Sequence, residues 1–261
     1  MTWAMTELDR VGCAVLADAI GETPETVMSV HQLRRGLCRS LVLGPPDRPE
    51  AAVTQAHSHP AEPTGFGNDP DQLWTLLRPL DQWSAVNVSC AVGPSLAELV
   101  ERDTGRACWL CDETYYTLDR PVIRWTHPAV RHLTLADVDL LERSTADLDM
   151  AGWRFGSAEA LVAEGSAAGA VVEDRLVAVA FTAARGDRHV GVGIVTAEPW
   201  RGRGLATAAA VLVCGEIQRA GQLPVWSTSV DNSASRRVAA KLGFSEVSRR
   251  VYVNQAPPLR N

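Results

Sequence analysis

The sequence EPWRGRGLATAAAVL, residues 198–212, joins the end of an apolar, β-rich run to the start of a segment with helical periodicity. At the junction, Arg201, Gly202, Arg203 and Gly204 alternate positive charge with glycine. A helix that begins there has unpaired N–H groups in its first turn and the positive end of its dipole behind them. The glycines let the main chain approach a phosphate closely, so the junction predicts an anion-binding site.

Two other phosphate-binding motifs do not fit this junction. A Walker loop needs an earlier glycine at the GxxxxGK spacing and Lys-Ser or Lys-Thr after its second glycine, and both are absent. The Rossmann spacing Gly-x-Gly-x-x-Gly is absent too. The strands before the loop also read as antiparallel, which a parallel βαβ unit excludes.

The segments around the junction predict the order β-α-β-β-β-α-β-α-β. Residues 130–148 read as a short strand and a helix that Thr134 or Asp137 caps, and residues 169–198 read as three consecutive antiparallel strands. A helix from Leu205 ends near Gly221. A strand, a helix opened by Asp231 or Asn232 and closed by Gly243, and a last strand follow.

Two motifs in this order resemble the GCN5-related N-acetyltransferases (the GNAT family). Residues 201–206 match the family's Arg/Gln-x-x-Gly-x-Gly/Ala signature. The later DNSASRRVAAKLGF, residues 231–244, resembles its Asn-x-x-Ala/Ser helix ending in Lys-Leu-Gly-Phe. The likeness extends from near Val122 to Val253. It implies an α+β fold with a mixed, mostly antiparallel sheet flanked by helices, and transfer of an acyl group from acetyl-coenzyme A (acetyl-CoA) to an amine.

The resemblance also implies where the coenzyme binds. The loop would hold the pyrophosphate, the strand before it would pair with the pantetheine arm, and the later helix would lie beside the same arm. Gly191 and Gly193 serve either to bend that strand or only to pack closely. The residues implied are Val195, Thr196, Arg201, Gly202, Arg203, Gly204, Leu205, Ala206, Thr207, Asn232 and Ser235.

The catalytic groups depart from the family pattern. The position where a tyrosine often protonates the leaving thiolate is Ala239, and residues 190–196 contain no carboxylate. Ser235 is a candidate to assist the thiolate, against the alternative of a plain helix-start serine. Glu198 is a candidate base acting through water, against the alternative of a solvated residue at a strand end. The prediction is therefore an N-acyltransferase acting on the primary amine of a small molecule, and the alternative is a weakly catalytic CoA-binding sensor or interaction partner.

Two further groups of residues are candidate sites. Trp153 and Arg154 lie where the family shapes its acceptor pocket, although core packing explains them equally well. His57 and His59 have the spacing of a partial metal site on a strand, but no third ligand is evident, so we expect no metal.

The first half of the sequence resembles part of the second half. Residues 84–118 have the same predicted order as residues 223–253: a strand, a short polar break, a helix, a glycine and a strand. Ser89 aligns with Ser227 and Gly105 with Gly243, at a constant offset of 138 residues. Upstream, Asp69 and Asp71 stand at a helix start, where they repel phosphate. We therefore expect a degenerate GNAT-like or accessory α/β domain at 1–121 and the catalytic domain at 122–261. The alternative is chance similarity between two βαβ stretches.

Composition sets the remaining limits. The chain has 261 residues, of which 46% are hydrophobic and 21% charged, and a net charge of −6. A net negative charge disfavours nucleic acid and acidic membrane surfaces as partners. No targeting or membrane-spanning stretch is evident, so a cytoplasmic protein is expected. The sequence does not predict an oligomeric state.

Overall fold

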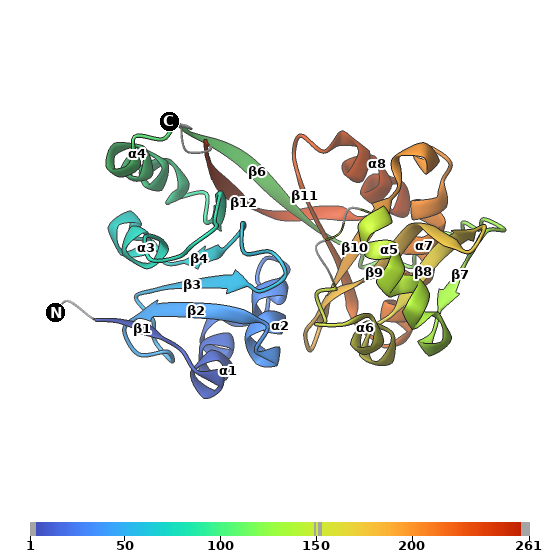
Figure 1. Ribbon diagram of the computed structural model, residues 1–261, viewed down its shortest axis with the longest axis horizontal. Coiled ribbons are helices and arrows are strands. Elements are labelled where there is room, and N and C mark those ends of the chain that lie inside the picture. Colours follow the sequence, from blue (N-terminus) through green and yellow to red (C-terminus); the bar gives the residue numbers. More distant parts are fainter. Residues whose placement is uncertain (1–3, 149, 151–152, 257–261) are drawn as a thin grey trace. The chain divides into compact units, whose positions relative to one another are not determined.

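The computed structural model describes residues 4–148, 150 and 153–256 (Figure 1). It divides into two compact units. The first unit consists of Met1–Thr114 with Ser229–Asp231 and Ser248–Asn261, and the second of Tyr115–Thr228 with Asn232–Val247. The first unit thus ends earlier than the predicted boundary at residue 121. It also includes the end of the last strand, from Ser248, which the sequence prediction places in the second domain.

The same element order, β-α-α-β-β-β-α-β-α-β, occurs twice along the chain. The first run is β1 (Met5–Glu7), α1 (Arg10–Ile20), α2 (Val27–Arg35), β2 (Cys38–Leu43), β3 (Ala51–Ala56), β4 (Thr64–Phe66), α3 (Pro70–Leu77), β5 (Ala85–Val88), α4 (Gly93–Thr104) and β6 (Cys108–Thr117). The second run is β7 (Val130–Leu133), α5 (Val138–Asp147), α6 (Ala158–Glu164), β8 (Ala167–Val172), β9 (Arg175–Arg185), β10 (His189–Thr196), α7 (Leu205–Arg219), β11 (Leu223–Ser229), α8 (Ser233–Leu242) and β12 (Ser245–Gln255). This repetition confirms the prediction of two related α+β folds.

The sheet of the second unit has the neighbour order β7-β8-β9-β10-β11. The pairs β8/β9 and β9/β10 are antiparallel, as predicted. The pair β7/β8 is antiparallel too, and β10/β11 is parallel. Glu173 and Asp174 make the turn between β8 and β9, with φ of 50° and 58°. Helix α7 packs across β7 to β10, where its Ala209, Ala210 and Val213 are fully buried. The small side chains let α7 lie close to the sheet.

The first unit has a sheet of neighbour order β1-β2-β3-β4-β5-β12. Its strands follow the two-residue period of a sheet buried on both faces. Leu41 and Val53 face a core built with α3 and α4, whereas Val42 and Ala52 face a second core built with α1 and α2. The end of β12 continues this sheet, because Val251–Asn254 pair with Ala85–Val88 of β5, and β6 is the next strand after β12.

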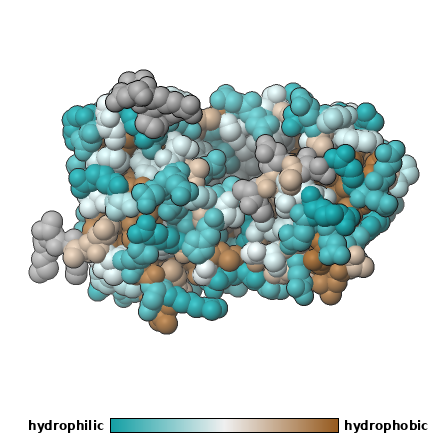
Figure 2. All heavy atoms as spheres, in the orientation of Figure 1, coloured by the Kyte–Doolittle hydropathy of each residue, from teal (hydrophilic) through white to brown (hydrophobic). Residues whose placement is uncertain are grey.

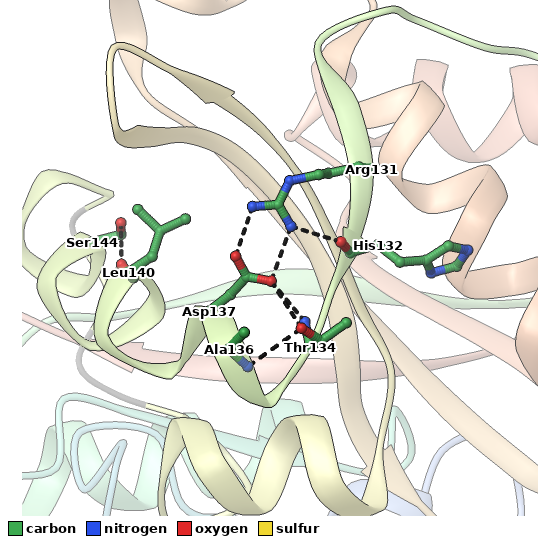
Figure 3. A network of polar contacts seen from close by, with 7 residues as sticks. All are labelled: Arg131, His132, Thr134, Ala136, Asp137, Leu140 and Ser144. Carbon is green, nitrogen blue, oxygen red and sulfur yellow. Dashed lines mark hydrogen bonds and ion pairs between the residues drawn. The ribbon is translucent and has the colours of Figure 1, made fainter.

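A capping box starts the first helical segment of the second unit (Figure 3). Thr134 is the N-cap of a short 3₁₀ helix, Leu135–Asp137, that leads into α5, and its hydroxyl accepts from Ala136 N at 3.3 Å. Asp137 accepts from Thr134 N at 2.9 Å and forms an ion pair with Arg131 at 2.6 Å. Both predicted caps therefore take part: Thr134 is the N-cap, and Asp137 is its partner in the capping box.

Two sequence predictions are corrected here. The predicted order lacks α6, which has only seven residues and begins at Ser157, whose hydroxyl accepts from Ala160 N. A helix this short gives little periodic signal, so the sequence pattern does not distinguish it from a connecting loop. His57 and His59 were predicted on a strand, but β3 ends at Ala56 and both lie in the turn after it. Among the described residues, no group of three or more His, Cys, Asp or Glu side chains could hold a metal ion.

Hydrophilic side chains predominate on the face shown in Figure 2, and apolar atoms occur there in small groups. Among the described helices, none is both long and apolar enough to cross a bilayer. The large apolar side chains that are exposed include Trp109 on β6 and Trp125 in the second unit.

Candidate functional site

A cavity of about 560 Å³ lies in the second unit, between the end of β10, the loop before α7 and one face of α8. Every residue that the resemblance implies for the coenzyme lines it. The full lining is Ile194, Val195, Thr196, Trp200, Arg201, Gly202, Arg203, Gly204, Leu205, Ala206, Thr207, Asn232, Ala234, Ser235, Val238 and Lys241.

The cavity lies where two parallel strands diverge. β10 pairs with β11 through His189, Val190 and Gly191, and no later β10 residue pairs with β11 in the described chain. A register shift between Gly191 and Val192 interrupts the pairing of β10 with β9 at the same level. Beyond it, alternate N–H and C=O groups of β10 face away from β9 without a strand partner. These free groups could pair with an extended ligand chain.

The loop before α7 leaves the start of that helix open. Gly202 and Gly204 have φ of 76° and 79°, a region that favours glycine, and Gly204 is an N-cap without a side-chain hydrogen bond. Arg201 Nε donates to Thr196 O at 3.2 Å, and an Arg203 Nη donates to Pro199 O at 3.1 Å. Neither arginine is ion-paired with a carboxylate in the described part of the chain. The loop therefore offers unneutralised charge and free N–H groups to an anion.

Helix α8 forms the opposite wall. Asn232 is its N-cap, and the side-chain oxygen of Asn232 accepts from Ser235 N at 3.0 Å. Ser235 Oγ accepts from the indole N–H of Trp226 at 2.9 Å, and Trp226 is fully buried. Because the indole can only donate, the Ser235 hydroxyl hydrogen is free to be donated elsewhere.

At the position where family members often carry a tyrosine, this chain has an alanine that lies in the core. Ala239 is fully buried in the cluster that includes Trp226, Leu242 and Phe244. A methyl group there supplies no proton, so Ser235 is the hydroxyl that α8 presents to the cavity.

Glu198 lies at a second cavity of about 450 Å³. Thr196, Trp200 and Arg201 line both cavities, so the two adjoin at the end of β10. Glu198 and Ser235 thus line different cavities, and the structure does not bring them together in one.

Trp153 and Arg154 line neither cavity. Trp153 is buried, and its ring contacts Phe181 edge to face, with centroids 5.3 Å apart. Phe181 in turn covers Gly193, where an added Cβ would lie 2.7 Å from Phe181 Cζ. Gly193 therefore serves close packing, while Gly191 lies at the register shift of β10. The indole N–H of Trp153 is buried with no hydrogen-bond partner among the described residues.

Sequence reasoning missed Trp125 and five of the residues that line this cavity, Lys241 among them. Lys241 lines it, and Lys241 Nζ lies 3.5 Å from the centroid of the Trp125 ring. A signal for Lys241 existed, because Ala234, Val238 and Lys241 lie at spacings of four and three, on one face of α8. No sequence pattern indicates Trp125, because only the tertiary structure brings it to the loop before α7.

Comparison with protein families identifies this half of the chain. Residues 130–251 match the model of the GNAT acetyltransferases. This half belongs to the GNAT acetyltransferase family. Members of that family use acetyl-CoA and act on amines of small molecules or proteins. No curated protein matches the chain.

Solved structures similar to the whole chain include GNAT proteins. A GCN5-related N-acetyltransferase-like protein from Streptococcus suis has a TM-score of 0.69 and 16% identity, over 94% of this chain and 99% of that one. A tandem GNAT protein from the clavulanic acid biosynthesis pathway has a TM-score of 0.56 and 16% identity, over 98% and 96%. A Drosophila protein has a TM-score of 0.68 and 14% identity, over 98% and 99%. At such identities the likeness shows the fold alone, and it extends over both halves of the chain.

Proposed function

We propose that the second unit transfers an acetyl or other short acyl group from acetyl-CoA to the primary amine of a small molecule, by direct attack in a ternary complex. The observation that carries the proposal is the continuity of one cavity from the open start of α7 to the diverging ends of β10 and β11. An extended, anionic thioester needs both parts, one for its phosphates and one for its amide-containing arm.

The coenzyme is assigned to the cavity residues by their chemistry. The main-chain N–H groups at Gly202, Gly204 and Leu205, with the two loop arginines, would bind the pyrophosphate. Val195 and Thr196 would pair with the pantetheine amides through the free edge of β10. Ala206, Thr207 and Asn232 would line the same path.

The chemistry requires a neutral amine and a stabilised thiolate. Ser235 is proposed to donate its hydroxyl hydrogen toward the leaving sulfur, because its oxygen is held by the Trp226 N–H. Glu198 is proposed to accept the amine proton through water, from the adjoining cavity.

The acceptor pocket is proposed near Trp153 and Arg154. Phe181 connects Trp153 to Gly193 on β10, so this pair lies behind the strand that would hold the thioester. The indole N–H of Trp153 is buried without a partner among the described residues, so it would donate to an acceptor oxygen only once this region opens.

The test is release of free thiol from acetyl-CoA across a panel of small primary amines. Amine-dependent release supports the transferase, and the acetylated product identifies the acceptor. The alternative, a CoA-binding sensor with little turnover, is favoured by the buried Ala239 in place of a tyrosine. Tight acetyl-CoA binding without release for any amine would support that alternative.

A further inference from the structure

Lys241 differs from the other charged residues of the second unit in its residue type and its surroundings. It is the only lysine among the 261 residues, and it lines the cavity on the same face of α8 as Ala234 and Val238. No carboxylate pairs with it in the described part of the chain. Together with Arg201 and Arg203 it makes the cavity strongly cationic, which favours an anionic occupant.

The indole of Trp125 fixes where this ammonium group lies. Lys241 Nζ is 3.5 Å from the centroid of the Trp125 ring, a cation–π contact. Atoms of the same ring lie 3.5 Å from the position of a Cβ on Gly204. One indole therefore spans from Lys241 to the N-cap residue of α7.

The segment that carries Trp125 is anchored to the second unit. Gln218 on α7 donates to Leu118 O at 3.1 Å and to Arg120 O at 2.7 Å, and its oxygen accepts from Val122 N at 3.0 Å. Arg120 Nε donates to Gly243 O at 3.0 Å. These four bonds hold residues 118–122, a few residues before Trp125, against the second unit.

A structural role at the end of α8 does not explain Lys241. A lysine in a last turn often interacts with the terminal carbonyl groups of its helix. Here the carbonyl of Gly243, just past the end of α8, already accepts from Arg120, and Lys241 Nζ lies on the Trp125 ring.

We propose that Lys241 binds a phosphate group of the coenzyme and that Trp125 is the residue that positions its ammonium group. The inference rests on the proposed function, because it adds a ligand to the same cavity. The phosphate is either in the pyrophosphate or at the 3′ position of the ribose, and the choice of probe distinguishes them.

Calorimetric titration with acetyl-CoA and with its 3′-dephospho form provides the test. Lys241→Met should raise the Kd for acetyl-CoA about tenfold, the loss of one charged hydrogen bond. Lys241→Arg should retain most of the affinity. The matched control is Arg237→Met, which removes a charge from an exposed α8 residue outside the cavity and should bind as the wild type does. If the 3′-phosphate is the partner, the dephospho form should bind wild type and Lys241→Met equally.

Selective labelling gives a second readout for Trp125. An amine-reactive acetylating reagent can modify only Lys241 and the amino terminus, so mass spectrometry reports one lysine. Acetyl-CoA should protect Lys241 in the wild type and in Trp125→Phe, which keeps an aromatic face. Protection should fall in Trp125→Leu, with the melting temperature of each variant recorded.

The outcomes separate the two proposals. A wild type that binds no acetyl-CoA overturns the proposed function and this inference with it. A wild type that binds while Lys241→Met binds equally, or while Lys241 is labelled at the same rate with and without acetyl-CoA, overturns the role of Lys241 alone. Equal protection in Trp125→Leu and Trp125→Phe overturns the role of Trp125.

Discussion

Ser235 is the residue on which the proposed chemistry depends most. If the Ser235 hydroxyl acts on the leaving sulfur as proposed, Ser235→Ala should lower turnover by about 10²-fold while leaving the Kd for acetyl-CoA nearly unchanged. Steady-state kinetics and calorimetric titration separate the two quantities. The matched control is Ser233→Ala, which removes a hydroxyl from the same helix outside the cavity. Equal losses in turnover and affinity would make Ser235 a binding residue, and no loss in either would refute its role.

Gly193 is a packing requirement with a clear control on the same strand. Gly193→Ala would place a methyl group 2.7 Å from Phe181 Cζ, and Phe181 is itself buried against Trp153. The ring has little room to move, so the substitution should cost about 1–3 kcal/mol in the free energy of unfolding. Gly191→Ala meets Ala184 at 3.5 Å, an ordinary contact, and should change stability by less than about 0.5 kcal/mol. Urea unfolding that shows equal stability for both variants would contradict this account.

At the scale of elements, the capping box before α5 makes stability depend on pH. The Arg131 guanidinium and the Thr134 N–H hold the pKa of Asp137 at about 2, below its usual 3.8. The ionised carboxylate therefore stabilises the fold above about pH 4, and this contribution is lost as pH falls through 2. Asp137→Asn should lower the free energy of unfolding at pH 7 by about 1 kcal/mol, a value reduced because Arg131 is half exposed.

Urea unfolding between pH 7 and pH 2 tests this pH dependence. The gap between wild type and Asp137→Asn should close toward pH 2. Asp139→Asn is the control, since Asp139 is exposed in the first turn of α5 and makes no ion pair among the described residues. A gap that stays constant to pH 2 would assign the effect to hydrogen-bond geometry instead of charge.

The elements that sequence reasoning predicted well have local signals. Asn232 caps α8 and Gly243 ends it at a φ of 97°, as the residue types indicate. The residues predicted to bind the coenzyme line one cavity because the motif keeps most of them adjacent along the chain. The divergence of β10 from β11 and the contact of Trp125 with Lys241 depend on tertiary pairing, which no local pattern encodes.

At the scale of the whole molecule, the order of helices and strands occurs twice, yet we expect only one coenzyme site in each chain. In the first unit, α3 corresponds to α7, but Asp69 caps it, accepting from Asp71 N at 2.9 Å and Gln72 N at 3.4 Å. The start of α3 is thus already satisfied by a carboxylate, which repels phosphate.

The first unit also closes the gap between its corresponding strands. β4 has three residues, against eight in β10. The buried Arg250 donates to Gly65 O on β4 at 2.7 Å and to Asn87 O on β5 at 3.2 Å. A guanidinium group bonded to both strands occupies the region where an extended arm would insert.

Calorimetric titration of the full chain should therefore give one equivalent of acetyl-CoA. Gly204→Asp should abolish binding, because it adds a carboxylate against the pyrophosphate. Aspartate is a favourable N-cap residue and tolerates positive φ, so the variant should fold and the loss should report repulsion. Gly204→Asn, with the same shape and no charge, should bind more weakly than wild type but measurably. Asp69→Ala should leave the stoichiometry at one, since Arg250 still joins β4 to β5. Two equivalents in the wild type, or full binding by Gly204→Asp, would refute a single site at the loop before α7.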